Sequence, residues 1–201
     1  MAKAATLAAA LLGFAAPASA QTAAGPVVAP TRDVAVTYRT TGGRDAGELR
    51  AAWLADEEKM RLDTPGGAFI RDGRAKRDTL LMTGQRMFVE GESEEGRGGG
   101  FSLAEPGDTV AREGTDSIAG HECTNWRIEA KKESLDGRAA EVKRACVTAD
   151  GVPLRVVQGE GEGRRSTVAT RVEYARQDPA RFRVPEGYRP FDPGALPQQR
   201  R

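Results

Sequence analysis

Apolar and polar residues alternate along much of the chain, beginning near residue 33. In DVAVTYRT, residues 33–40, Val34, Val36 and Tyr38 alternate with small or polar residues. A period of two is typical of a half-buried strand, because successive side chains of a strand point to opposite faces. The segment therefore predicts a β-strand.

Further short runs of this kind follow, and turn residues separate them. The dipeptides Asp136–Gly137 and Asp150–Gly151 are typical of β-hairpin turns. In the last run, alternation places Val168, Val172 and Tyr174 on one side. The pattern predicts an antiparallel meander with strands in AFIRDG (68–73), DTLLMT (78–83), QRMFVEG (85–91), DSIAGHECTNWRIEAK (116–131), AEVKRACVTADG (140–151), VPLRVVQGEG (152–161) and STVATRVEYARQ (166–177).

The segment Ala46–Met60 is ambiguous between strand and helix. Leu49, Ala51 and Trp53 alternate as in a strand, and the hairpin signal TPGG follows at residues 64–67. The segment also contains good helix formers around residues 57–59. We favour two strands, with a short helix as the alternative.

Two segments lack the pattern of a central strand. EGESEEGRGGG, Glu90–Gly100, has no apolar residue and is expected to form a mobile loop of unknown role. DPARFRVPEGYRPFDP, residues 178–193, carries four prolines and cannot continue a central strand. It is expected to lie across an open edge or end of the sheet, anchored by Phe182, Val184, Tyr188 and Phe191.

The N-terminus has the layout of a signal peptide. Lys3 precedes an apolar stretch, Ala4–Ala16, and Ala18–Ala20 forms a small-x-small cleavage site. We expect a signal peptide at 1–20 cleaved after Ala20, a flexible lead-in at 21–31, one domain at 32–191 and a disordered tail at 192–201. The expected destination is the periplasm, with secretion as the alternative, and no apolar run is long enough for a transmembrane anchor.

Charge argues against nucleic acid as a partner. The chain has 30 Lys and Arg against 29 Asp and Glu. A nucleic-acid-binding protein usually shows a basic stripe, whereas the two signs alternate here.

The two cysteines, Cys123 and Cys146, predict a disulfide, since an exported chain with two cysteines has an obvious oxidised pairing. Alternation places Trp126 and Ile128 on the face opposite Cys123. A zinc site would require four ligands at short spacing, and a redox site would require Cys-x-x-Cys. Neither pattern is present, so no metal and no cofactor is expected.

No residue pattern predicts catalysis. His121 is the only histidine, so any triad would have to use it, and the sequence lacks Gly-x-Ser-x-Gly and His-Glu-x-x-His. His121 is expected to form hydrogen bonds with the backbone or with water, at a turn after Gly120. The adjacent acids at 57–58 and 94–95 would point to opposite faces of a strand. We therefore expect a protein that is not an enzyme.

Five stretches carry a resemblance to a known superfamily. They are VTYRT (36–40), MRLDTPGGAFIRDG (60–73), SIAGHECTNWRI (117–128), ACVTADGVPLRV (145–156) and DPARFRVPEGY (178–188). In this order they resemble the LolA/LppX-type half-barrel superfamily of cell-envelope proteins, and within it a periplasmic family of unknown function. The resemblance implies a mainly β (α+β) fold: a curved antiparallel sheet or incomplete barrel with one or two short helices packed on its concave face.

Members of that superfamily with known roles carry lipids or lipoproteins across the periplasm. The resemblance therefore implies a non-enzymatic periplasmic protein that binds a lipid or acyl chain in an apolar cavity. An envelope interaction or structural protein with a filled core is the alternative, and ligand identity, protein partner and oligomeric state stay open. Residues expected to line the cavity are Val36, Tyr38, Trp53, Met60, Leu62, Phe69, Trp126, Ile128, Val168 and Tyr174.

Overall fold

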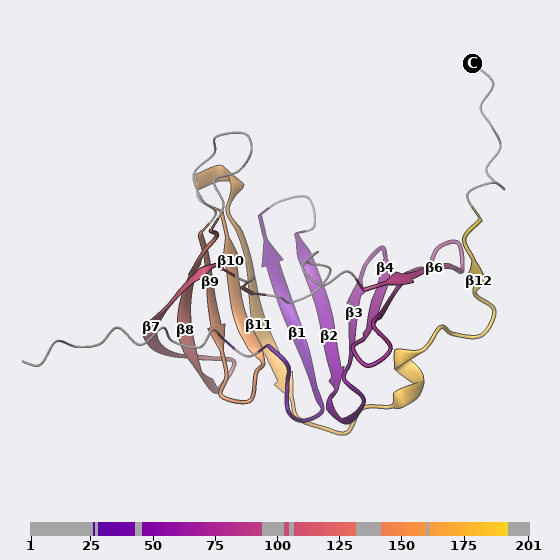
Figure 1. Cartoon of the computed structure of the whole chain (residues 1–201), viewed down its shortest axis with the longest axis horizontal. Coiled ribbons are helices and arrows are strands. Elements are labelled where there is room, and N and C mark those ends of the chain that lie inside the picture. Colours follow the sequence, from indigo (N-terminus) through magenta and orange to yellow (C-terminus); the bar gives the residue numbers. More distant parts are fainter. Residues whose placement is uncertain are drawn as a thin grey trace, which may run out of the picture.

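The computed structural model describes residues 26, 28–42, 46–93, 103–104, 107–131, 142–159 and 161–192. These residues form one sheet of twelve strands, in the order β12-β6-β5-β4-β3-β2-β1-β11-β10-β9-β8-β7 (Figure 1). The strands are β1 (Val34–Thr41), β2 (Gly47–Leu54), β3 (Lys59–Thr64), β4 (Gly67–Asp72), β5 (Arg77–Met82), β6 (Met87–Glu92), β7 (Thr109–Ile118), β8 (His121–Glu129), β9 (Val142–Val147), β10 (Pro153–Gln158), β11 (Arg165–Glu173) and β12 (Arg189–Pro190).

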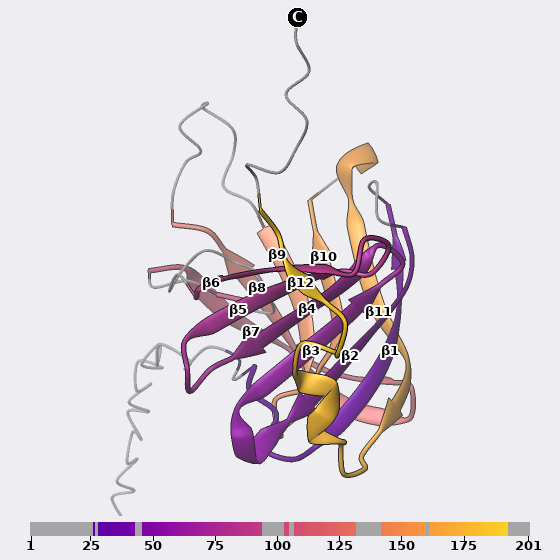
Figure 2. The ribbon, with the colours of Figure 1, turned by 90° about the vertical axis from the view of Figure 1, so that its right-hand side faces the viewer.

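The sheet is curved and open. The strands β1–β6 form one side, β7–β11 form the other, and β1 pairs with β11 in the middle. Figure 2, a view turned by 90°, shows β2–β6 in front and β7–β9 behind them. The strands β7 and β12 lie at the two ends of the order and do not pair with each other. The predicted fold class, a curved antiparallel sheet rather than a closed barrel, is confirmed.

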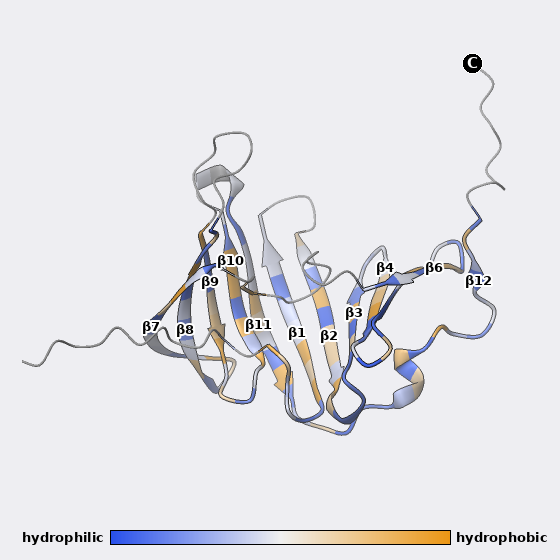
Figure 3. Cartoon of the chain, in the orientation of Figure 1, coloured by the Kyte–Doolittle hydropathy of each residue, from blue (hydrophilic) through white to orange (hydrophobic). Residues whose placement is uncertain are grey.

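The two faces of the sheet are covered differently. We call the face that carries Tyr38, Trp53 and Phe69 the inner face, because it looks toward the opposite side of the curve. The outer face of β2–β6 carries Ala52 and Ile70, among others, and the C-terminal segment packs on it (Figure 2). Residues 51–54 of β2 are all buried, because both faces of the sheet are covered there, and Figure 3 shows apolar and polar residues mixed along this strand.

The proline-rich C-terminal segment covers the outer face and then extends the edge. Phe182 ends the 3-10 helix η3 (Pro179–Phe182) and packs on Ala52 and Leu54. Val184 and Tyr188 pack against the outer-face cluster of Ala68, Ile70 and Leu81. The segment then pairs with β6 in parallel through β12, and Phe191 N donates to Phe88 O. The C-terminal segment was predicted to lie across an edge or end of the sheet. It does so only where β12 pairs with β6, and most of its contacts are with the outer face.

The ambiguous segment Ala46–Met60 is extended, as favoured. It forms β2, a single 3-10 turn η1 (Ala55–Glu57) and the start of β3. A third 3-10 turn, η2, covers Gly161–Gly163, and the described part of the chain contains no α-helix. The expected short helices are therefore 3-10 turns, and the one with a buried apolar residue, η3, packs on the outer face rather than the concave one.

Two strands were not predicted, β7 and the two-residue β12, and one predicted run is split. The run at 116–131 is divided by a tight turn at Ala119 and Gly120, whose φ angles are 50° and 80°. The preceding strand β7 was missed, because TVAREGTDSI has few apolar residues and lies at the end of the sheet.

The predicted loop and termini lie partly outside the described residues. Strand β6 includes the first residues of the Glu90–Gly100 loop, and residues 94–100 are not described. The predicted signal peptide and residues 193–201 of the predicted tail are also not described.

Candidate functional site

A continuous apolar row crosses the inner face. Its residues stand directly opposite one another in register, and opposed residues of neighbouring strands point to the same face. Seven strands contribute one residue each: Val172, Val36, Ala51, Leu62, Phe69, Leu80 and Val89, from β11 to β6.

The row is buried in the middle of the sheet and exposed at its β6 end. Val36 and Ala51 are each 2% exposed, whereas Leu80 is 49% exposed and Val89 is 43% exposed. These two are the exposed large apolar side chains of the described part of the chain. A soluble protein tolerates single exposed apolar residues, but here the two are adjacent and continuous with the core. The concave side of β4–β6 therefore offers an apolar surface that no described segment buries.

A hollow of about 430 Å³ lies beside this row, at the Trp53 and Met60 end of the inner face. It lies within the usual size range of ligand pockets. Trp53 and Met60 supply apolar walls, and Lys59, Arg71 and Glu58 supply charges of both signs. Arg71 is held by two hydrogen bonds to Asp78, of 2.9 and 2.8 Å, and these lower the pKa of the Asp78 carboxyl.

Residues 28–32 form a strap along this hollow. Val28, Ala29 and Pro30 line it, and Pro30 is buried. Val28 also packs against the apolar cluster of Leu103 and Ile128. Part of the segment expected as a lead-in, residues 28–31, thus contacts the domain.

The strap is fastened at Asp150, in the turn between β9 and β10. Thr31 N donates to Asp150 O, and Arg32 Nε donates to the Asp150 carboxylate at 2.9 Å. The Arg32 guanidinium also stacks over the Tyr174 ring, 3.8 Å from its centroid. Burial alone would raise the pKa of Asp150, but hydrogen bonds from Thr148, Arg32 and Tyr174 outweigh burial and lower it.

A second apolar cluster covers the inner face of β7–β10. Trp126 and Ile128 pack there with Ala145 and Val147, and Leu103 packs on the same cluster. The register Trp126↔Ala145↔Val156↔Thr167↔Thr40 shows that this cluster and Tyr38 share one face. The second cluster therefore continues the apolar lining of the concave side.

Eight of the ten residues predicted to line a cavity lie on the inner face. They are Val36, Tyr38, Trp53, Met60, Leu62, Phe69, Trp126 and Ile128. Tyr174 lies just beyond β11, where its hydroxyl donates to Asp150 and its ring packs edge-on to His121.

Val168 lies on the outer face, which corrects the prediction for this residue. It stands opposite Arg39 and Arg155, whereas Val172 stands opposite Val36. A β-bulge between these positions adds Thr170 to β11 and reverses the alternation. Alternation within the runs 78–83 and 85–91 could have placed Leu80 and Val89 on the inner face. At Leu80 the pattern is ambiguous, because the next residue, Leu81, is equally apolar.

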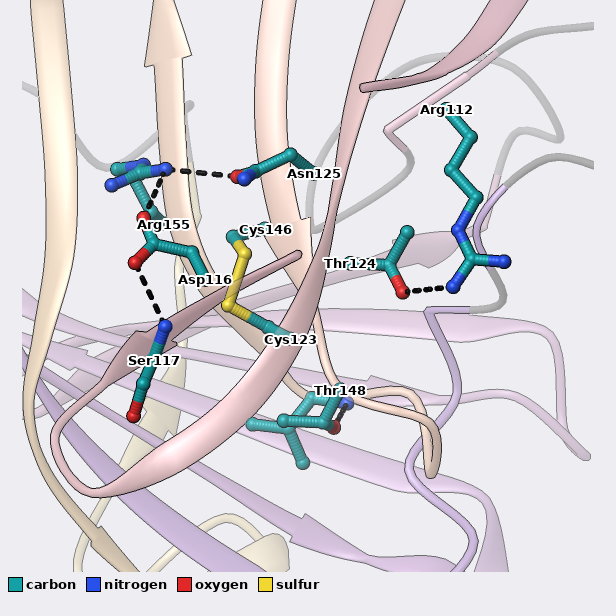
Figure 4. The surroundings of a disulfide bond; sticks show 10 residues. Arg112, Asp116, Ser117, Cys123, Thr124, Asn125, Cys146, Thr148 and Arg155 are labelled. Carbon is teal, nitrogen blue, oxygen red and sulfur yellow. Dashed lines mark hydrogen bonds and ion pairs between the residues drawn. A yellow bond between two sulfur atoms is a disulfide. The ribbon is translucent and has the colours of Figure 1, made fainter. Parts of the chain in front are cut away.

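The predicted disulfide is present. Cys123 on β8 and Cys146 on β9 are bonded, with Cα atoms 5.3 Å apart (Figure 4). Asn125 stands directly opposite Cys146, so the two cysteines form a diagonal pair. Both are buried, and they lie on the face opposite Trp126, as alternation predicts. The bond fastens two neighbouring strands.

The remaining chemistry-bearing residues are engaged in structural contacts. His121 packs on Tyr174, Glu57 pairs with Lys59 at 2.8 Å, and Glu58 pairs with Arg74 at 3.4 Å. Among the described residues, no group of three His, Cys, Asp or Glu side chains could hold a metal ion. No helix in the described part of the chain is long and apolar enough to cross a membrane.

Comparison with solved structures identifies the fold. The chain is similar to the MucA/MucB complex structure of Pseudomonas aeruginosa, with 10% identity, a TM-score of 0.50, and coverage of 76% of this chain and 56% of that one. It is also similar to a structure of PNGF-II, with 11% identity, a TM-score of 0.50, and coverage of 81% and 31%. The lipoprotein LppX of Mycobacterium tuberculosis is 19% identical, with coverage of 70% and 85% and a TM-score of 0.42.

At a TM-score of 0.50, the chain shares its fold with the structure of the MucA/MucB complex. The chain spans a little over half the length of the MucB chains that it matches, 56% to 59%. No family model matches the sequence, and no curated protein matches it. At these identities the half-barrel likeness concerns the fold, so function has to be argued from this chain's own residues.

Proposed function

We propose that the protein is a non-enzymatic, exported binding protein that holds a lipid or acyl chain on its concave face. The observation that carries the proposal is the apolar row that runs out of the core to the exposed Leu80 and Val89. An exposed apolar surface continuous with the core is typical of a binding site, because water contact there costs free energy that a ligand relieves.

The hollow beside Trp53 supports the same proposal. Its volume of about 430 Å³ is suited to part of an alkyl chain, and the strap residues Val28–Pro30 form one of its walls.

Export to the periplasm is part of the proposal. A buried disulfide forms and persists in an oxidising compartment, and the N-terminal sequence has the layout of a signal peptide. Both features fit a protein that meets lipids between two membranes.

Native mass spectrometry of protein purified from the envelope of its own host tests the proposal. We expect a bound mass in the range of a lipid or fatty acid, released by organic solvent. A bare polypeptide mass, together with no uptake of a fatty acid added at saturating concentration, would contradict it.

An envelope interaction protein without a small ligand is the second candidate, and the edge strand β7 favours it. This strand is ten residues long and lies at the end of the sheet, so its free edge can accept an added strand from a partner. The same mass measurement separates the two candidates, since a filled core predicts the bare mass.

A further inference from the structure

A second hollow, of about 600 Å³, lies on the outer face and differs in chemistry from the inner face. We call it the arginine hollow. The register Arg144↔Val157↔Ser166 places its floor on β9, β10 and β11, on the face that also carries Cys146. The apolar row lies on the other face. The lining of the arginine hollow includes Arg144, Arg155, Arg164, Glu113, Asn125 and Ser166.

Positive charge dominates the described lining of the arginine hollow. Among the described residues, three guanidinium groups and one carboxylate, that of Glu113, line it. The contact from Arg144 Nε to Glu113 is long, at 3.9 Å. No ion pair joins Arg164 to another residue within the described part of the chain. Two of the three arginines are therefore available to an incoming anion.

Arg155 is held in a fixed orientation. Its Nη2 lies 2.9 Å from Asn125 Oδ1 and 2.9 Å from Asp116 Oδ2 (Figure 4). Asp116 in turn accepts a hydrogen bond from the backbone N–H of Ser117 at 2.8 Å. The neighbouring disulfide joins β8, which carries Asn125, to β9, which lies between β8 and the strand of Arg155, β10.

A tight turn after β10 brings Arg164 to the hollow. Gly159 and Gly161 have φ angles of 73° and 57°, which residues with a side chain rarely adopt. A Cβ at Gly159 would meet the Gly163 carbonyl oxygen at 3.0 Å. The turn depends on these glycines, and both line the hollow.

We propose that the arginine hollow binds the phosphate group of a small anionic molecule. Arg144 and Arg164 contact the phosphate oxygens, and Arg155 fixes the shape of the floor. Guanidinium groups match phosphate geometry with paired N–H donors, and charge-assisted hydrogen bonds are the strong ones. The volume exceeds that of a bare phosphate, so there is room for the remainder of a phosphorylated molecule. By register, the floor of the hollow lies on the face opposite the apolar row, and Trp126 and Ala145 of the inner-face cluster also border it.

Titration with inorganic phosphate and with glycerol 3-phosphate, followed by amide chemical shifts at constant ionic strength, tests the proposal. We expect saturable shifts at Gly159, Gly161 and Ser166, and no comparable shift with chloride. The double variant Arg144→Gln/Arg164→Gln should weaken binding by about tenfold or more, because it removes two charge-assisted contacts. Both side chains lie at the surface, and circular dichroism would verify that the variant folds.

The matched control is Arg74→Gln/Arg171→Gln, which removes the same charge from exposed arginines that pair with Glu58 and Glu173. It should bind as tightly as the parent protein. Equal weakening in both double variants would overturn the proposal, as would shifts that chloride reproduces. A parallel assay with phosphatidylglycerol vesicles distinguishes a lipid headgroup from a free phosphate. Absence of binding to inorganic phosphate, to glycerol 3-phosphate and to the vesicles also overturns the proposal.

Discussion

Asp150 is the residue on which the N-terminal strap depends. Its carboxylate accepts hydrogen bonds from Thr148 Oγ1 at 2.6 Å, Arg32 Nε at 2.9 Å and the Tyr174 hydroxyl at 3.1 Å. Such a carboxylate is more stable ionised than protonated, and its pKa falls below the usual value. One side chain thus joins the strap, the β9–β10 turn and the end of β11.

This arrangement predicts a pH-dependent cost for Asp150→Asn. A lowered pKa in the folded state stabilises the protein above the unfolded pKa of about 3.9, and the effect is lost as pH falls through the folded pKa. We expect the variant to lose about 1 kcal/mol of unfolding free energy at pH 7, and clearly less below about pH 3. Urea unfolding at both pH values measures this. Glu173→Gln, at an exposed pair, should show little cost at either pH, and a pH-independent cost at Asp150 would contradict the argument.

At the scale of the strand, the bulge in β11 decides which valine faces the concave side. Val172 packs against the main core cluster, whereas Val168 stands beside Arg39 and Arg155. We expect Val172→Asp to cost more than about 2 kcal/mol, since it places a carboxylate among apolar groups. Val168→Asp should cost less than about 1 kcal/mol, because the cross-strand arginines attract the new charge. Comparing the two variants by urea unfolding tests the register, and equal costs would contradict the bulge.

Alternation of residues was sufficient to predict most strands and most of the inner face. It could not predict the bulge, because an inserted residue such as Thr170 leaves no mark in composition. It also missed β7, since an edge strand exposed on most of its length needs few apolar residues. The Cys123–Cys146 bond required only the cysteine count, whereas the arginine hollow needs residues from five strands and a turn, which spacing along the chain does not reveal.

The disulfide acts at the level of the β8–β9 pair. It joins residues 23 apart in the sequence, and closing a loop of this length restricts the unfolded chain by about 3 kcal/mol in the chain-entropy model. We expect Cys123→Ala/Cys146→Ala to lose about this much stability in urea unfolding. Reducing agent should destabilise the parent protein by a similar amount and leave the double variant unchanged. Sensitivity of the variant to the reductant would contradict this account.

At the scale of the whole molecule, the curvature of the sheet leaves different amounts of space on its two sides. The inner face is filled by its own side chains near β1, β11 and β2, and the outer face of β2–β6 is covered by the C-terminal segment. The inner face at β5 and β6 lacks such a cover among the described residues, and Leu80 and Val89 remain exposed. The fold thus places its exposed apolar area inside the curve, where a ligand would contact several strands at once.

Removing this apolar area should reduce ligand binding without reducing stability. In Leu80→Ser/Val89→Ser, the affected side chains are already 49% and 43% exposed, so the free energy of unfolding should change by less than about 1 kcal/mol. An apolar ligand that buries them would lose the corresponding transfer free energy, about tenfold in affinity. Fluorescence titration with the uncharged probe N-phenyl-1-naphthylamine measures this. Val157→Ser/Val168→Ser, on the outer face, is the matched control and should bind like the parent protein. Unchanged affinity in the inner-face variant would show that the apolar row does not form the site, and it would favour the protein with a filled core and a docking edge.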